Sequence, residues 1–194
     1  MTATTRDLMR SAEIKEIVRS AYAAVALSSE TVAQKLYSPE QLAQVPQVSI
    51  EGALGVANHL RHAQIDPGET VLDLGCGAGI DTILAAFRAG AAGRVIALDF
   101  LPDMLERTRA AAAEIGLTNV ELLEGDIEAI PLRDSSVDHI ISNGVINLAP
   151  RKARVLAECA RVLRPGGKLT VADLTVDEEE LPPEIVTHPA TWAG

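Results

Sequence analysis

The sequence predicts an α/β protein with a doubly wound, mostly parallel sheet and a helical cap before it. After about residue 70, short runs that are apolar on both faces alternate with helical stretches, which is typical of a parallel sheet covered on two sides. The first apolar run ends in a glycine-rich loop that leads into a helix. Right-handed crossovers between such strands give a doubly wound sheet.

The elements of the sheet domain follow in regular order. Pro102 opens one helix, and the run from Pro165 to Gly167 is expected to end another. Helices are expected at 80–88, 102–116 and 150–167. Strands are expected at 70–75, 94–100, 119–126, 137–143 and 168–176.

The first third of the chain has helical rather than strand-like patterning. Helices are expected at 14–27, 30–37, 38–45 and 53–62. We therefore divide the chain into a helical cap (1–65), a sheet domain (66–176) and a C-terminal segment (177–194). The acidic run at 177–180 is expected to be a solvated turn.

Composition and charge exclude several classes of partner. The 194 residues carry a formal net charge of −10 and no basic stripe, which argues against nucleic acid. The N-terminus lacks the apolar core of a signal peptide, and no run could span a bilayer. We expect no membrane partner and, by default, a cytoplasmic location. Cys76 and Cys159, the only cysteines, give neither a disulfide framework nor a zinc cluster.

The stretch VLDLGCGAGID (71–81) carries the strongest functional signal. Its glycines, Gly75, Gly77 and Gly79, permit a sharp turn and a close approach of the backbone to a ligand. The G-x-G-x-G spacing, followed by Ile80, differs from the G-x-G-x-x-G of dinucleotide-binding folds. This difference disfavours a nicotinamide-dependent oxidoreductase.

Acidic residues stand near the ends of the first three expected strands. Asp73 precedes the first glycine by two residues. Asp99 ends the second strand, where a carboxylate can accept hydrogen bonds from two ribose hydroxyls. Asp126 and Ile127 follow the third strand.

These motifs, together with DSSVDHIISN and RVLRPGGKL, resemble class I S-adenosylmethionine-dependent methyltransferases over about residues 66–175. The resemblance implies a Rossmann-like methyltransferase sheet, S-adenosyl-L-methionine as cofactor and a small-molecule methyl acceptor. In that family the acid matching Asp126 bonds the adenine amine, and the backbone N–H matching Ile127 meets the ring. The expected cofactor-binding residues are Asp73, Gly75, Cys76, Gly77, Gly79, Asp99, Phe100, Asp126, Ile127 and Asn143.

Other candidate residues have more ordinary interpretations. Phe100 either lies against the adenine ring or packs in the core. His59 and His62 lie one turn apart on an expected helix, which favours a surface or lid role over a metal site. His139 and Cys159 are expected to be buried. Neither a catalytic residue nor an oligomeric state is predicted.

A wider resemblance, over about residues 37–194, is to arsenite methyltransferases. YSPEQLAQVP, ISNGVINLAP and LPPEIVTHPATWAG carry it. In that family, cysteine thiolates hold the soft arsenic atom. Here VSIEGALGVANHL has no cysteine, Gly144 stands in the place of the second, and the third would follow Gly194. We therefore expect a different small acceptor, with Gly144 opening space beside the methyl donor.

Two alternatives remain open: arsenite methylation by a longer chain, and a degenerate cofactor-binding fragment without turnover. Relatives follow the fifth strand with a helix and a hairpin, so the fifth strand here is expected to be an exposed apolar edge. Gly194 is expected to be an interruption. Either the sequence is truncated there, or the next codon is UGA, read as selenocysteine.

Overall fold

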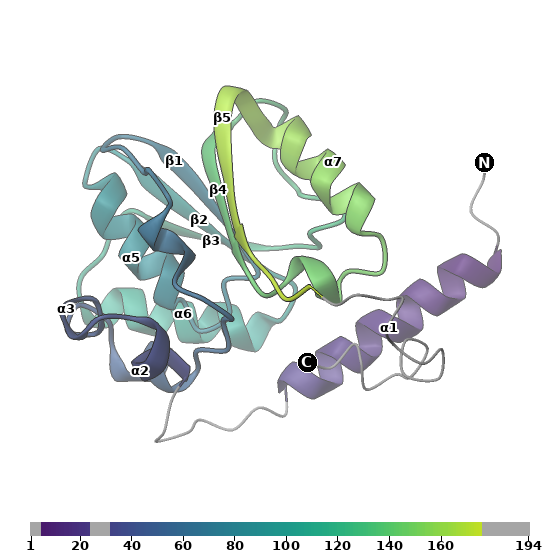
Figure 1. Cartoon of the computed structure of the whole chain (residues 1–194), viewed down its shortest axis with the longest axis horizontal. Helices are drawn as coiled ribbons and strands as arrows, with labels where there is room; N and C mark the ends of the chain where they lie inside the picture. The colour runs from purple at the N-terminus through teal and green to yellow at the C-terminus, as the bar shows by residue number, and fades with distance from the viewer. Residues whose placement is uncertain (1–4, 24–31, 176–194) are drawn as a thin grey trace.

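The computed structural model describes residues 5–23 and 32–175, and its centre is a five-stranded parallel sheet (Figure 1). The strand order β3-β2-β1-β4-β5 reverses direction at β1, which makes the sheet doubly wound, as predicted. The strands are β1 (Thr70–Leu74), β2 (Arg94–Asp99), β3 (Val120–Glu124), β4 (Val137–Asn143) and β5 (Leu163–Ala172).

Helices cover both faces of this sheet. Helices α5 (Ile80–Ala89) and α6 (Pro102–Glu114) pack on one face, and α7 (Lys152–Val162) packs on the other. The inner strands β1, β2 and β4 are therefore buried on both sides, which explains their nearly continuous apolar sequences. His139 and Cys159 are buried, as predicted.

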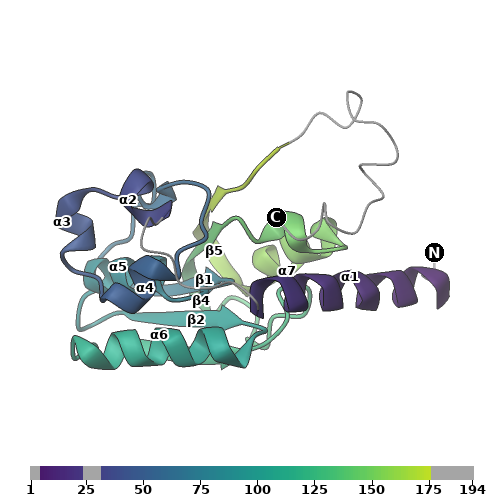
Figure 2. The same cartoon turned by 90° about the horizontal axis from the view of Figure 1, so that it is seen from below.

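The N-terminal region is helical but differs in detail from the prediction. It contains α1 (Thr5–Ala23), α2 (Val32–Leu36), α3 (Pro39–Leu42), α4 (Gln47–Glu51) and the single 3-10 turn η1 (His59–Arg61). The expected helix at 53–62 is wrong, because the N–H groups of Val56 and Ala57 donate to the Asn143 side chain instead of to helix carbonyls. Figure 2 shows α1 lying beyond the carboxyl ends of the strands.

The boundary between α7 and β5 also differs from the prediction. The helix ends at Val162, and the run Pro165–Gly167, expected to end a helix, lies inside β5. The pairing of β5 with β4 shifts register across this run. Proline is tolerated here because β5 is an edge strand.

The expected apolar edge is present in the described part of the chain. Leu169 and Val171 of β5 are 37% and 41% exposed. Expectations for residues 176–194, the acidic run and Gly194 included, lie outside the described residues. The proposed domain boundaries stay predictions. Within 5–23 and 32–175, none of the helices has the length and apolar character that a membrane crossing requires.

Candidate active site

The glycine loop is a tight turn between β1 and α5, fixed by backbone and side-chain hydrogen bonds. Cys76 N–H donates to the Leu98 carbonyl at 3.0 Å, and Gly79 N–H donates to the Cys76 carbonyl at 2.9 Å. Thr108 of α6 donates its hydroxyl to the Gly77 carbonyl at 2.9 Å. The loop is thereby held against β2 and α6 at the carboxyl edge of the sheet.

The three glycines of this loop have different reasons to be glycine. All three have positive φ. A Cβ on Gly75 would lie 2.6 Å from the Val145 side chain, and one on Gly79 would lie 2.7 Å from Thr108, so packing excludes both. A Cβ on Gly77 would meet no atom within 4 Å, and Gly77 lines the adjoining pocket. Gly77 is therefore the position in this loop where the backbone is accessible to a ligand in the pocket.

Asp99 faces the same loop from the end of β2. Its Oδ2 accepts from Gly77 N–H at 3.0 Å, and its Oδ1 accepts from Leu101 N–H at 2.9 Å. Burial raises the pKa of Asp99, and the backbone donors oppose that rise. The carboxylate lines the pocket with lone pairs still free for hydroxyl donors.

Asp73 lies below the loop and is almost completely buried. Its Oδ2 accepts from the Thr82 hydroxyl at 2.5 Å. Burial, and after it the negative charge of Asp81, raises the pKa of Asp73 to about 8. Asp73, Asp81, Asp99 and Asp126 all line the pocket, so its wall is strongly acidic.

Asn143 joins the cap to the sheet through its side-chain amide. Its Oδ1 accepts from Val56 N–H at 2.9 Å, while its Nδ2 donates to the Ala57 carbonyl at 2.8 Å and to Asp81 Oδ2 at 2.9 Å. Tyr37 donates to the other oxygen of Asp81 at 2.7 Å. The amide of Asn143 is therefore occupied by protein partners, although the residue lines the pocket.

The surface or lid role expected for His59 is wrong. Its side chain is buried, with Nδ1 3.9 Å from Asp81 Oδ2 and no hydrogen-bond partner on either ring nitrogen. Burial lowers the pKa of His59, so a neutral imidazole is favoured. His62 is exposed, in keeping with its expected role. Among the described residues, no group of three or more His, Cys, Asp or Glu could hold a metal ion.

Phe100, Asp126 and Ile127, the residues expected at the adenine, also line the pocket, and their contact with adenine stays a prediction. Phe100 does not pack in the core: its ring lines the pocket, and the Arg19 guanidinium lies 5.6 Å from the ring centroid. Sequence reasoning missed Lys15, whose ammonium group pairs with Asp126.

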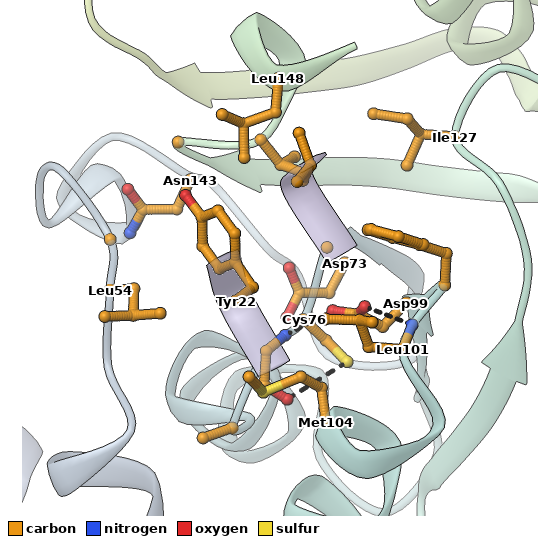
Figure 3. Close-up of a pocket in the computed structure, with 18 of the residues that line it drawn as sticks. Tyr22, Leu54, Asp73, Cys76, Asp99, Leu101, Met104, Ile127, Asn143 and Leu148 are labelled. Carbon is orange, nitrogen blue, oxygen red and sulfur yellow. Dashed lines mark hydrogen bonds between the residues drawn. The ribbon is translucent and has the colours of Figure 1, made fainter. Parts of the chain in front are cut away.

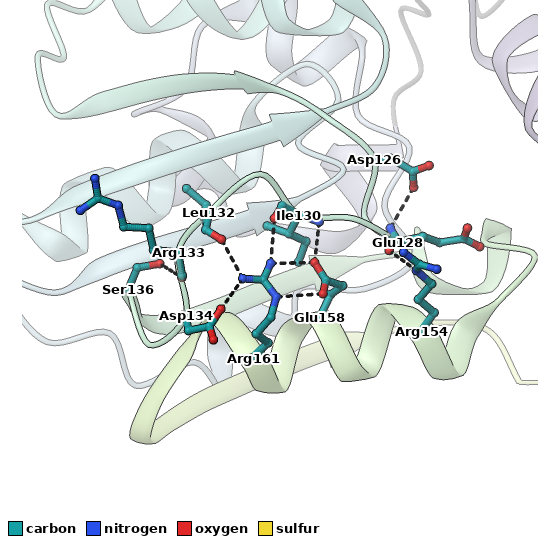
Figure 4. A network of polar contacts seen from close by, with 10 residues as sticks. All are labelled: Asp126, Glu128, Ile130, Leu132, Arg133, Asp134, Ser136, Arg154, Glu158 and Arg161. Carbon is teal, nitrogen blue, oxygen red and sulfur yellow. Dashed lines mark hydrogen bonds and ion pairs between the residues drawn. The ribbon is translucent and has the colours of Figure 1, made fainter.

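The loop after Asp126 is anchored to α7 by a polar network (Figure 4). Arg161 donates to the carbonyls of Ile130 and Leu132, each at 2.8 Å, and pairs with Glu158 and Asp134. This network fixes the backbone at 130–132, which follows Asp126 and Ile127.

The end of the pocket nearest β4 is apolar. Leu54, Gly144, Val145 and Leu148 line it, and Figure 3 shows the Tyr22 ring reaching into it from α1. Burial, and then the charge of Asp173, raises the pKa of Tyr22, so its hydroxyl stays protonated. Gly144 has φ +77°, and a Cβ there would lie 3.2 Å from Val56. The expectation that Gly144 opens space is therefore wrong: Val56 fills it, and the backbone conformation itself favours glycine.

Of the ten expected cofactor residues, nine line this pocket. The exception is Gly79, which packs against Thr108. Their placement in one pocket agrees with a shared ligand, but their individual roles in cofactor binding stay predictions.

Comparison with known proteins gives a consistent result. A family model described as a methyltransferase domain matches residues 65–193. An arsenite methyltransferase of Halobacterium salinarum is 41% identical over 158 residues, covering 81% of this chain and 40% of that protein. A demethylmenaquinone methyltransferase of Listeria monocytogenes is 36% identical over 110 residues, covering 57% of this chain and 46% of that protein. The chain thus spans less than half the length of these curated relatives.

Solved structures agree with the sequence relatives. The crystal structure of an arsenic(III) S-adenosylmethionine methyltransferase from Chlamydomonas reinhardtii matches with a TM-score of 0.65 and 34% identity. The match covers 90% of this chain and 54% of that one.

Three features define a Rossmann-like protein that binds a nucleoside-containing cofactor at its strand ends. They are the doubly wound sheet, the open space beside Gly77 and the acid Asp99 at the end of β2. The family match makes the assignment specific. The chain belongs to the methyltransferase domain family. Its cofactor is S-adenosylmethionine.

The residues of the pocket fit this cofactor. Gly77 leaves a space that any Cβ would fill, and Asp99 has lone pairs free for ribose hydroxyls. Lys15 is the only cationic side chain among the described lining residues, against four carboxyl groups. Such a wall suits a sulfonium cation and repels the pyrophosphate of a dinucleotide.

Cofactor affinity is expected to rise with pH up to about pH 8, because the pKa of Asp73 is raised to about 8 in the free protein. A cation bound at this wall favours the ionised carboxylate, so binding releases a proton. Affinity then rises by up to about tenfold per pH unit and levels off above the pKa. Calorimetry from pH 6 to 9, in two buffers of different ionisation enthalpy, measures the proton release.

Four titratable groups face Asp73: Tyr37, Cys76, Asp81 and Asp99. Asp73→Asn is therefore the control, and it should flatten the pH dependence. S-adenosylhomocysteine, which lacks the sulfonium charge, should show a shallower slope. An unchanged slope in Asp73→Asn would assign the proton to another group.

Proposed function

We propose that this chain is an S-adenosylmethionine-dependent methyltransferase that transfers a methyl group to a small, largely apolar acceptor. The observation that carries the proposal is a single pocket with two unlike ends. An acidic cofactor end surrounds Gly77, and an apolar end is lined by Leu54, Val145 and Leu148. A site of this kind can hold two reactants in contact, which is the main catalytic requirement for methyl transfer.

The cofactor, when bound, supplies an activated methyl group that is displaced from sulfur by a lone pair of the acceptor. The protein positions both partners and excludes water. Asp99 and Gly77 hold the nucleoside end, while Leu54, Val145 and Tyr22 close the acceptor end. No histidine lines the described pocket, and burial keeps Cys76 protonated by raising its pKa. The acceptor end, lined by Leu54, Val145, Leu148 and Tyr22, therefore offers neither a carboxylate nor a histidine as a base, and an acceptor whose lone pair is already free suits it best.

Arsenite methylation is the second candidate, favoured by the relatives from Halobacterium salinarum and Chlamydomonas reinhardtii. The two cysteines of this chain do not support it. Cys76 is a buried residue of the glycine loop, with its sulfur 3.7 Å from the Thr108 hydroxyl, and Cys159 of α7 packs against the sheet. They belong to separate core clusters and cannot share one soft ligand.

Gly144→Cys is expected to destabilise the protein by about 1–2 kcal/mol without creating an arsenite site, because φ +77° is a left-handed conformation that L-residues avoid. Urea unfolding measures the loss of stability. Isothermal titration calorimetry with arsenite measures binding. Gly144→Ala is the matched control and should lose about the same stability. A cysteine variant that binds arsenite tightly would show that one thiolate is enough.

The proposed function is tested by incubating the protein with S-adenosylmethionine carrying a labelled methyl group. The candidate acceptors are arsenite, a small thiol and an apolar phenol or quinol. Label transfer to an organic acceptor supports the proposal, and arsenite turnover at about 1 s⁻¹ or faster favours the second candidate. Binding without transfer to any acceptor would indicate a cofactor-binding fragment. Tight NAD binding without S-adenosylmethionine binding would revive the oxidoreductase interpretation.

The remaining expectations about partners and location stay predictions: no nucleic-acid partner, no membrane partner and a cytoplasmic location. Cell fractionation tests the last of these.

A further inference from the structure

One lysine connects α1 to the expected adenine site. Lys15 Nζ donates to Oδ2 of Asp126, and it donates to Oε2 of Glu128 at 2.9 Å. The lysine side chain is 31% exposed and lines the pocket beside Asp126. Its partners lie 111 and 113 residues further along the chain, so the contact is purely tertiary.

The acceptor capacity of Asp126 is only partly used by the protein. Oδ1 accepts from Glu128 N–H at 2.8 Å, and Oδ2 accepts from Lys15. A carboxylate offers about four lone-pair sites, so about two remain. The side chain is 41% exposed at the pocket, so a further N–H group can be accepted without displacing Lys15.

Glu128 explains why a cation is needed at this place. Its carboxylate is 2% exposed and is fixed by Arg151, through the backbone N–H at 2.8 Å and the guanidinium Nη2 at 2.8 Å. It therefore cannot move away from Asp126, and two neighbouring carboxylates repel each other. Lys15 bridges them and offsets that repulsion. Without Lys15, only the Glu128 N–H bond to Asp126 Oδ1 and the charge of Arg151 would oppose that repulsion.

We propose that Lys15 is a positioning residue of the cofactor site, which holds the Asp126 carboxylate where it accepts the exocyclic amino group of adenine. Lys15 thereby makes the site selective for a 6-aminopurine over a 6-oxopurine. This inference rests on the proposed function and on the expected role of Asp126.

The test compares two ligands in calorimetry: S-adenosylhomocysteine and its 6-oxo analogue, S-inosylhomocysteine. Lys15→Met is expected to weaken the binding of S-adenosylhomocysteine by about tenfold, which is the scale of one charge-assisted hydrogen bond. The affinity for S-inosylhomocysteine should stay nearly unchanged. The preference for the amino ligand therefore falls about tenfold. A merely structural role would weaken both ligands equally and would overturn the inference.

Further variants sharpen the result. Lys15→Arg should restore the preference, and Glu13→Gln, an exposed change on the same helix, should leave it intact. In an Asp126→Ala background, Lys15→Met should cause no further loss of preference; an additional loss there would contradict the inference. Lys15→Gln is measured in the same way if Lys15→Met does not fold. If the wild-type protein binds neither ligand, the proposed function fails instead.

Discussion

Replacing Gly77 by valine is expected to weaken cofactor binding about hundredfold or more while leaving the chain folded. The reason is the empty space in front of this residue: a Cβ would meet no protein atom within 4 Å, and the residue lines the pocket. Valine would fill the volume in which the cofactor must lie, and overpacking of this kind costs about 1–3 kcal/mol or more. Gly77→Ala should give a smaller loss in the same direction. Calorimetry with S-adenosylhomocysteine measures both.

Gly116→Val provides a matched control for this prediction. Gly116 has φ +68°, close to the +53° of Gly77, and a Cβ there would also meet nothing within 4 Å. It follows α6 on the exposed surface and does not line the pocket. Both variants should therefore lose about 1–2 kcal/mol or somewhat more of stability from backbone strain, but only Gly77→Val should lose affinity. Equal affinity in the two variants would show that the cofactor does not contact the loop at Gly77.

The sheet was predictable because its signals are local. Strand β4 matches its expected range of 137–143, and β1 lies within the expected 70–75, since apolar runs bounded by glycine and polar residues specify buried strands. The prediction of the boundary between α7 and β5 failed because it, too, relied on a local signal. A Pro-Gly-Gly run indicates a helix end by local rules, but pairing with β4 draws those residues into the sheet.

The cofactor end of the pocket was predictable from motifs, whereas the contacts that support it were not. Asp73, Gly77 and Asp99 stand at fixed distances from strand ends, which a sequence displays directly. Lys15 meets Asp126 across 111 residues, and no periodicity marks such a pair. The burial of His59 beside Asp81 depends on the irregular 52–58 loop, which the Asn143 side chain holds in place of a helix. Residues Tyr37 and Tyr22 carried no local signal for their places in the site.

Asp99→Ala is expected to weaken cofactor binding by about hundredfold or more, because one side chain performs two tasks. Its oxygens hold the N–H groups of Gly77 and Leu101, and its free lone pairs face the pocket. Loss of two hydrogen bonds from ribose hydroxyls to a charged acceptor corresponds to about 3–6 kcal/mol. The affinity for S-adenosylhomocysteine, measured by calorimetry beside the melting temperature, separates lost binding from lost folding.

Two variants decide whether the charge or the shape of Asp99 matters more. Asp99→Asn retains one acceptor oxygen and nearly the same volume, so it should keep the Gly77 turn and bind more tightly than Asp99→Ala. Asp103→Ala, an exposed acid in the first turn of α6, should bind like the wild-type protein. If Asp99→Asn binds the cofactor as weakly as Asp99→Ala, then the negative charge of Asp99, and not its shape, is the essential feature. If Asp99→Ala retains wild-type affinity, the ribose is not held at the end of β2.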